Sequence, residues 1–187
     1  MAPYFLVCAL TILIVRCREL MTITWLTGQL LNEAANFVLK RKFKQARPHG
    51  APKIGFDEHG MPSSHAQFMG FFLAFAVCVL LFRVRVNILS KLSVIACTLT
   101  LTGLVCFSRT ELGFHTHEQV LVGVAVGLVL GAVWFTTAAK FLFPRFRTIC
   151  SSSAGRLLML RDGACINNVL AFENAAYRKL YETSKDL

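Results

Sequence analysis

The chain has 187 residues, of which 55% are hydrophobic and 16% charged, and its mean hydropathy is +0.57. A soluble domain of this length does not need so much apolar surface, so the composition excludes an ordinary soluble protein and indicates an integral membrane protein. The formal net charge is +10, but Lys and Arg stand mainly at the ends of apolar segments, which favours membrane anchoring and an anionic ligand over nucleic acid.

The first two apolar segments differ in length and polarity. Residues 2–15 end at Arg16 rather than at a small-residue cleavage site, which predicts a shortened first helix and not a signal peptide. Residues 20–39 are long enough to span a bilayer but include polar side chains, so one face of this helix must be shielded from lipid. These polar residues are Gln29, Asn32, Glu33 and Asn36. A signal anchor or a re-entrant helix is an alternative for either segment.

Three later runs carry no charge, namely residues 66–82, 92–108 and 119–137. Each is close to the roughly 20 residues that a membrane-spanning helix needs. A charge at mid-bilayer costs about 2.5 to 3.5 kcal/mol on insertion scales, so uncharged runs are a strong signal. The expected fold class is therefore all-α, an integral membrane bundle of about four to five transmembrane helices with the active site at one membrane face.

The chain is expected to divide into a transmembrane domain and a tail. The transmembrane domain covers residues 1–140, with its core at 20–140, and the tail covers 141–187. Within the tail, residues 169–181 mix apolar and polar side chains in the manner of an interfacial helix.

Five crossings would place loops 40–61 and 109–118 on one side of the membrane and the tail on the other. Lys40, Arg47 and Arg109 are candidates for binding an anionic ligand and are left out of the count of loop charges. The other Lys and Arg residues are then more frequent on the side of the tail, which predicts a cytosolic tail and lumenal loops.

Three short segments at the ends of these predicted helices carry the chemistry. Lys40, Arg47 and Arg109 supply the cations that phosphoryl transfer needs around the equatorial oxygens. Ser63 and Ser64 precede an apolar helix whose first free N–H groups form an anion site, and His65 stands beside it. The alternatives are a solvated basic loop that touches lipid headgroups and an ordinary N-cap.

His115 follows Arg109 across a loop short enough to bring both to one ligand. His117 and Glu118 beside it are weak evidence for a metal, because no further ligands stand at suitable spacing. The seven cysteines show neither a disulfide framework nor a CxxC metal motif.

A polar stripe in the second predicted helix fits the same site. Gln29, Glu33, Asn36 and Lys40 are spaced four, three and four apart, so they share one helix face. We expect Glu33 and Asn36 to support the site from behind, with Glu33 pairing with Lys40 or orienting another cation; the alternative is that Glu33 only satisfies polar groups between helices.

Taken together, these segments resemble the signature of the type 2 phosphatidic acid phosphatase superfamily, K-x6-R-P, P-S-[GS]-H and S-R-x5-H-x3-D, over about 80 residues. The resemblance implies that His115 is the nucleophile that forms a phosphohistidine and that His65 protonates the leaving group. It further implies phosphate binding by Lys40, Arg47 and Arg109, supplemented by Ser63 and Ser64, with no metal or other cofactor.

One position departs from that signature, since Gln119 stands where the superfamily has aspartate. Gln119 lies four residues after His115 in the predicted helix, so its amide oxygen can accept a hydrogen bond from the His115 ring. This bond fixes the tautomer but adds no charge.

The stretches CREL, LNEAANFVLK, GMPSSHAQFM and LLMLRDGACINNVLAFE further resemble the dolichyl diphosphate phosphatases within that superfamily, which have a longer N-terminus than this sequence. This implies hydrolysis of a polyisoprenyl diphosphate in the endoplasmic reticulum membrane, which recycles the lipid carrier of N-glycosylation. The alternatives are a broader lipid phosphatase acting on isoprenoid, sphingoid or phosphatidic substrates and a non-catalytic lipid-binding scaffold. The oligomeric state stays open.

Overall fold

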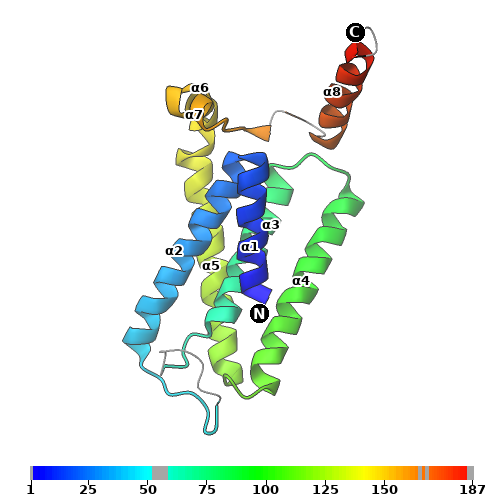
Figure 1. The fold of residues 1–187 in the computed structure, drawn as a ribbon. Coiled ribbons are helices and arrows are strands. Elements are labelled where there is room, and N and C mark those ends of the chain that lie inside the picture. The colour runs from blue at the N-terminus through cyan, green and yellow to red at the C-terminus, as the bar shows by residue number, and fades with distance from the viewer. Residues whose placement is uncertain (1, 52–58, 164–165, 167–168, 185–187) are drawn as a thin grey trace.

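The apolar segments form an up-and-down bundle of helices (Figure 1). The computed structural model describes residues 2–51, 59–163, 166 and 169–184. The bundle consists of α1 (Ala2–Cys17), α2 (Leu20–Phe43), α3 (Ser64–Phe82), α4 (Ile88–Glu111) and α5 (His117–Phe141). The tail adds η1 (Phe143–Arg145), α6 (Phe146–Ser151), α7 (Ser153–Leu157) and α8 (Val169–Ser184). Every predicted apolar segment is a helix, and the loops with the three signature segments meet at one end, as expected.

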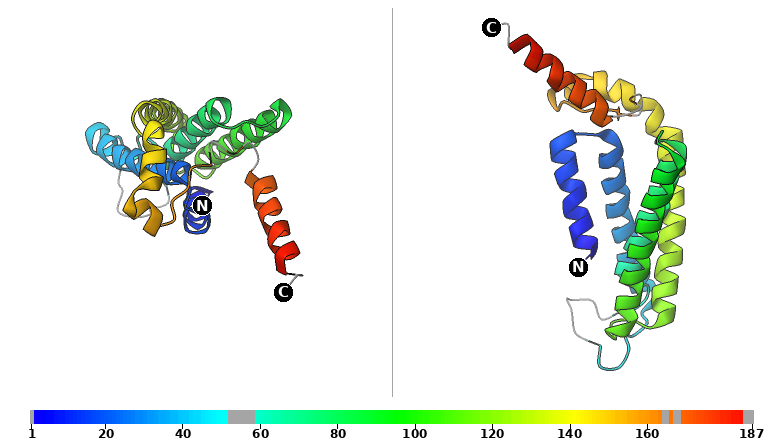
Figure 2. Two further views of the ribbon diagram at one scale, coloured as in Figure 1. Left: turned by 90° about the horizontal axis from the view of Figure 1, so that it is seen from above. Right: turned by 90° about the vertical axis from the view of Figure 1, so that its right-hand side faces the viewer.

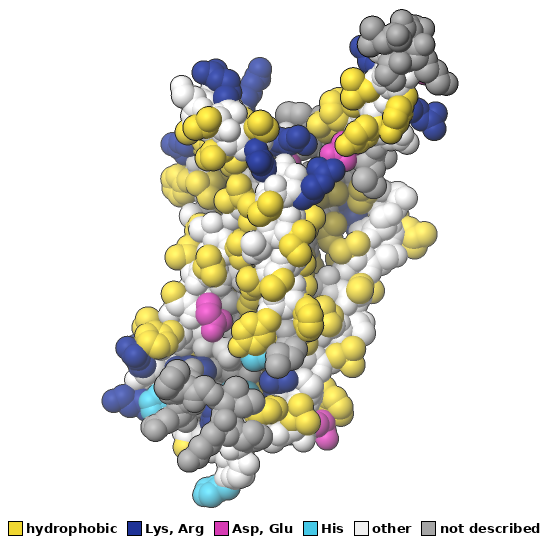
Figure 3. Space-filling view, in the orientation of Figure 1, with side chains coloured by type: hydrophobic (Ala, Val, Ile, Leu, Met, Phe, Trp, Pro, Cys, Tyr) yellow, Lys and Arg dark blue, Asp and Glu magenta, His cyan; other side chains and the backbone are white. Residues whose placement is uncertain are grey.

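Three of the described helical stretches are long and apolar enough to cross a membrane, namely Ser64–Phe82, Ile88–Glu111 and His117–Ser151. Helix α1 is apolar but shorter. On the face shown in Figure 3, Lys and Arg gather at the two ends of the molecule and hydrophobic side chains cover most of the length between them. This distribution is that of a bundle whose middle lies in hydrocarbon and whose ends lie in water.

Helices α3 and α5 make the most extensive helix contact in the structure, and glycine makes it possible. Gly123, Gly127 and Gly131 form one stripe on α5. A Cβ atom on Gly123 or Gly131 would lie 2.7 Å from a carbonyl oxygen of the facing segment, and one on Gly127 would overlap the carbonyl oxygen of Gln67. In lipid, helices associate through such close backbone packing rather than through the hydrophobic effect.

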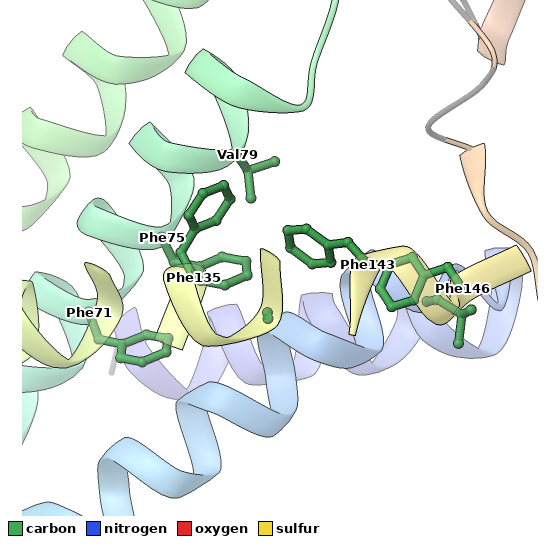
Figure 4. Packing of buried hydrophobic residues seen from close by; sticks show 8 residues of the cluster. Phe71, Phe75, Val79, Phe135, Phe143 and Phe146 are labelled. Atoms are coloured by element: carbon green, nitrogen blue, oxygen red, sulfur yellow. The ribbon is translucent and has the colours of Figure 1, made fainter. Parts of the chain in front are cut away.

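A row of aromatic rings connects α3 and α5 to the start of the tail (Figure 4). Phe71, Phe75, Phe135, Phe143 and Phe146 follow one another with ring centroids 5.3–6.1 Å apart. The bundle is therefore packed tightly at the end opposite the signature loops.

The tail is tied to the same end by backbone hydrogen bonds. The Leu20 amide donates to the Arg161 carbonyl, and the Arg161 amide donates to the Arg18 carbonyl, each at 2.9 Å. The Gly163 amide donates to the Glu19 carboxylate at 2.8 Å. Helix α8 then extends away from the bundle (Figure 2), and residues 164–165, 167–168 and 185–187 of the tail lie outside the described part.

The glycine stripe yields a matched test. Gly127→Ala should destabilise the protein by about 1–3 kcal/mol, because the new methyl group forces α3 and α5 apart. Gly103→Ala in α4 should be neutral or stabilising by up to about 1 kcal/mol, because a Cβ there meets nothing within 4 Å. Thermal unfolding in detergent measures both, and equal midpoints for the two variants would contradict the packing argument.

Candidate active site

The site begins with two cations at the end of α2 and in the loop that follows it. Lys40 lies in the last turn of α2 and is only 3% exposed. Arg47 follows in the next loop, and the two ends of that loop are held together, since Ala46 pairs with His59 and the Gly60 amide donates to the Gln45 carbonyl at 2.7 Å. The Arg47 Nε atom is buried and has no hydrogen-bond partner within the part of the chain that the structure describes.

A buried polar ladder joins α2 to α3 and positions Lys40. The Gln67 side-chain amide donates to the backbone carbonyl and the side-chain oxygen of Asn32, both at 2.9 Å. Asn36 donates to the Gln67 side-chain oxygen at 2.8 Å, and Gln29 donates to the Phe68 carbonyl at 3.2 Å. Because these bonds replace water inside the bilayer, they shield the polar face of α2 from lipid as predicted.

The predicted polar stripe of α2 is buried at Gln29, Asn36 and Lys40, and Asn32 joins it in the buried ladder. Glu33, the fourth predicted member, is exposed and lines a small cavity beside His65. The polar face of α2 is wider than the surface that α3 covers, so the packing of α3 decides which polar side chains are buried.

Ser63 occupies the N-cap position of α3, but its side chain makes no capping hydrogen bond. Instead its backbone amide donates to the Gln119 carbonyl at 3.1 Å, and its buried hydroxyl has no partner among the described residues. Ser64 and His65 follow in the first turn of the helix, and the His65 ring meets the edge of Tyr4 with centroids 6.0 Å apart.

The α4–α5 loop folds back on Arg109. The amides of Phe114 and His115 both donate to the Arg109 carbonyl, at 3.1 and 3.2 Å, and Gly113 provides the left-handed conformation (φ 67°) that the turn needs. The Arg109 guanidinium lies over the Phe114 ring, 4.9 Å from its centroid. The short loop thus brings the backbones of Arg109 and His115 together.

Gln119 holds His115 in one orientation. The His115 Nδ1 atom lies 3.2 Å from the Gln119 side-chain oxygen. That oxygen also accepts from the Thr116 amide, while the Gln119 side-chain nitrogen donates to the Ala46 carbonyl at 2.9 Å. The Ala46 carbonyl and the Thr116 N–H fix the orientation of the Gln119 amide, so its oxygen faces the ring and favours the tautomer with the proton on Nδ1 of His115. The lone pair for chemistry is then on Nε2.

The cations of the site act electrostatically on His115 and His65. Lys40 and Arg47 lie close enough to His115 to act on it electrostatically, and Lys40, Arg109 and His115 act in the same way on His65. Burial, the largest cause, acts together with Arg47 and Lys40 to lower the pKa of His115 from 6.5 to about 4, and hydrogen bonds to Gln119 and to the Gly60 backbone oppose this shift in part. His115 is therefore neutral at neutral pH, as a nucleophile must be.

The structure brings together most of the predicted site residues and adds others. Asn32, Gln67, Gln45 and Gly60 were not predicted. Thr116-x-x-Gln119 does carry a readable capping-box signal, and the structure shows that box. Gly60 leaves space for Gln119, since a Cβ there would lie 2.6 Å from its side-chain nitrogen. Within the described residues, no group of three or more His, Cys, Asp or Glu is placed to hold a metal ion.

Comparison with known proteins gives consistent matches. The family model of the PAP2 superfamily matches residues 20–143. The chain is 33% identical over 186 residues to mouse (Mus musculus) Dolichyldiphosphatase 1, covering 95% of this chain and 78% of the relative. The Dictyostelium discoideum protein of the same name is 35% identical over 160 residues, covering 83% and 69%. Lipid phosphate phosphatase gamma of Arabidopsis thaliana is 35% identical over 182 residues, covering 90% and 77%. No solved structure matches the chain.

The buried His115 should titrate far below a free imidazole. Ring-carbon NMR of histidine-labelled protein, assigned by the signal lost in His115→Ala, should give a midpoint of about 4. Between 6.5 and 4 the unfolded chain binds a proton at this residue and the folded chain does not, so this group lowers the free energy of unfolding as the pH falls through that window. A midpoint near 6.5 would show that the ring is solvated.

Proposed function

The chain belongs to the PAP2 superfamily, and from this membership we propose that it hydrolyses dolichyl diphosphate to dolichyl phosphate and inorganic phosphate. The relatives from mouse and Dictyostelium discoideum that carry the name Dolichyldiphosphatase 1 support the substrate. The single observation that carries the chemistry is the His115 ring, neutral and oriented by Gln119, beside Lys40 and Arg47.

In this proposal His115 Nε2 attacks the terminal phosphorus, and His65, protonated when the negatively charged diphosphate binds beside it, protonates the departing dolichyl phosphate. Lys40, Arg47 and Arg109 neutralise the phosphoryl oxygens, which is the main requirement of phosphoryl transfer. The unpartnered Arg47 Nε atom and the Ser63 hydroxyl, both buried, support such a role, because an anion can satisfy them. Ser64 and the first N–H groups of α3 add further donors. Water then hydrolyses the phosphohistidine, and the scheme uses no metal ion.

Asn36 and Gln119 support these groups without touching the substrate. Asn36 links α2 to α3 below Lys40, and Gln119 orients His115. Glu33 remains a candidate for tuning the site, now from its exposed position at the cavity that His65 also lines.

A broader lipid phosphatase is the second candidate. The observation in its favour is the Arabidopsis thaliana relative, whose name, Lipid phosphate phosphatase gamma, is not limited to dolichyl substrates. Phosphate release from dolichyl diphosphate, sphingoid phosphate and phosphatidic acid, measured side by side, separates the two candidates.

We further infer that the protein works in the endoplasmic reticulum membrane with the site facing the lumen, where it recycles the lipid carrier of N-glycosylation. The division into a transmembrane domain (1–140) and a tail (141–187) belongs to the same proposal. The end opposite the site carries many arginines, which fits the cytosolic side. They are Arg16, Arg18, Arg83, Arg85, Arg145, Arg147, Arg156 and Arg161.

Phosphate release from dolichyl diphosphate should survive a chelator and should be lost in His115→Ala. The matched control is His117→Ala, two residues further on but exposed, which should keep wild-type activity. Rapid quenching with radiolabelled substrate should trap label on the wild-type protein and not on His115→Ala. Release that persists in a folded His115→Ala protein would refute the assigned nucleophile.

The orientation has its own test. A protease-sensitive epitope tag added after the C-terminus should be digested in sealed endoplasmic reticulum vesicles, because the tail is placed in the cytosol. A lumenal marker protein serves as the control for vesicle integrity. Protection of the tag until detergent is added would place the active site in the cytosol instead.

A further inference from the structure

The Gln119 amide is rigidly held and uncharged, whereas orienting His115 requires only that it be held. It is 1% exposed, and its oxygen is the group that accepts the His115 Nδ1 proton. Its nitrogen is held by the Ala46 carbonyl and the Gln45 side chain, at 2.9 and 3.2 Å, so the amide cannot turn away. The partner of the nucleophile is thus rigid and carries no charge.

A neutral partner matters because His115 becomes positively charged during the reaction. When Nε2 bonds to phosphorus while Nδ1 keeps its proton, the ring becomes a phosphorylated imidazolium. In the described part of the chain, the charged groups that act on His115 are Lys40 and Arg47, with His65 across the site. The two cations destabilise the positive charge on the imidazolium until the bound phosphate compensates their own charge. The amide dipole of Gln119 stabilises the imidazolium less than a carboxylate would.

We propose that Gln119 is a specificity-determining residue that restricts this site to lipid diphosphates, because an uncompensated imidazolium intermediate forms only from a substrate with a good leaving group. This inference rests on the proposed function and narrows it. Gln119 touches the nucleophile and not the substrate, so it acts as a positioning residue.

The Nε2 lone pair forms the N–P bond, the bond from phosphorus to the bridging oxygen breaks, and its electron pair leaves with dolichyl phosphate, which takes the His65 proton. A water then forms the new P–O bond, its proton passes to His65, and the N–P electron pair returns to Nε2. Dolichyl phosphate, the leaving group of the first step, is a phosphate monoester whose second pKa is about 6. Dolichyl phosphate as a substrate would release an alkoxide, which resembles hydroxide from water of pKa about 15.7 and leaves far less readily.

A matched pair of variants tests the charge alone. Gln119→Asn and Gln119→Asp are equally short, so both weaken the link to Ala46, but only Asp adds a negative charge beside Nδ1. The measurement is kcat/KM for dolichyl diphosphate divided by kcat/KM for dolichyl phosphate in detergent micelles. The lipid is the same in both, and the ratio cancels the active fraction and any loss common to both substrates.

The wild type should have a large ratio, Gln119→Asn should keep it, and Gln119→Asp should lower it about tenfold or more, which corresponds to one pKa unit of charge stabilisation on the imidazole. The acidic limb of the kcat/KM profile should move to higher pH in Gln119→Asp and not in Gln119→Asn, a change that a purely structural role does not produce.

Equal ratios in the two variants, with an active wild type, would overturn the inference and leave the proposed function standing. A folded wild type that is inert on dolichyl diphosphate would overturn the proposed function itself. If both short variants are inactive, Gln119→Glu, which keeps the length, is compared with the wild type by the same ratio, and an unchanged ratio there overturns the inference.

Discussion

The close contact between α3 and α5 is the constraint on which the site depends. Because α5 presents glycine to α3, the two backbones approach until Ser63 and Gln119 share a hydrogen bond. His65 follows Ser63 by two residues, and His115 is held by Gln119. The relative placement of the two histidines is therefore set by packed helices rather than by loops. This is the precision that phosphoryl transfer between two fixed groups requires.

The cationic half of the site is attached by different means. Helix α2 joins α3 through amide side chains, and Lys40 stands at the end of that ladder. Inside a bilayer an unpaired amide is costly, so each bond both satisfies a polar group and fixes the register of α2. The polar residues that look unfavourable in a membrane helix are thus the ones that attach the helix carrying Lys40 to the rest of the site.

The electrostatics of the site combine several cations with a neutral histidine. Burial keeps His115 unprotonated, and nearby cations reinforce this. On the proposed function, the same cations attract the substrate phosphates. Gln119 adds direction without charge. On the proposed function, this balance suits a reaction whose leaving group needs little assistance, which connects the choice of an amide at this position to the choice of a diphosphate as substrate.

The sequence by itself determined the helices, because uncharged runs of bilayer length have few alternatives to a membrane helix. It also determined that the signature loops share one end, because alternate loops of an up-and-down bundle lie at the same end. The tertiary structure decided which atoms meet. It put Asn32 rather than Glu33 in the buried ladder, recruited Gln67, and gave Gln119 a second partner in Ala46. Helical spacing defines a face only to within a residue or so, whereas a hydrogen bond requires the rotation of the neighbouring helix as well.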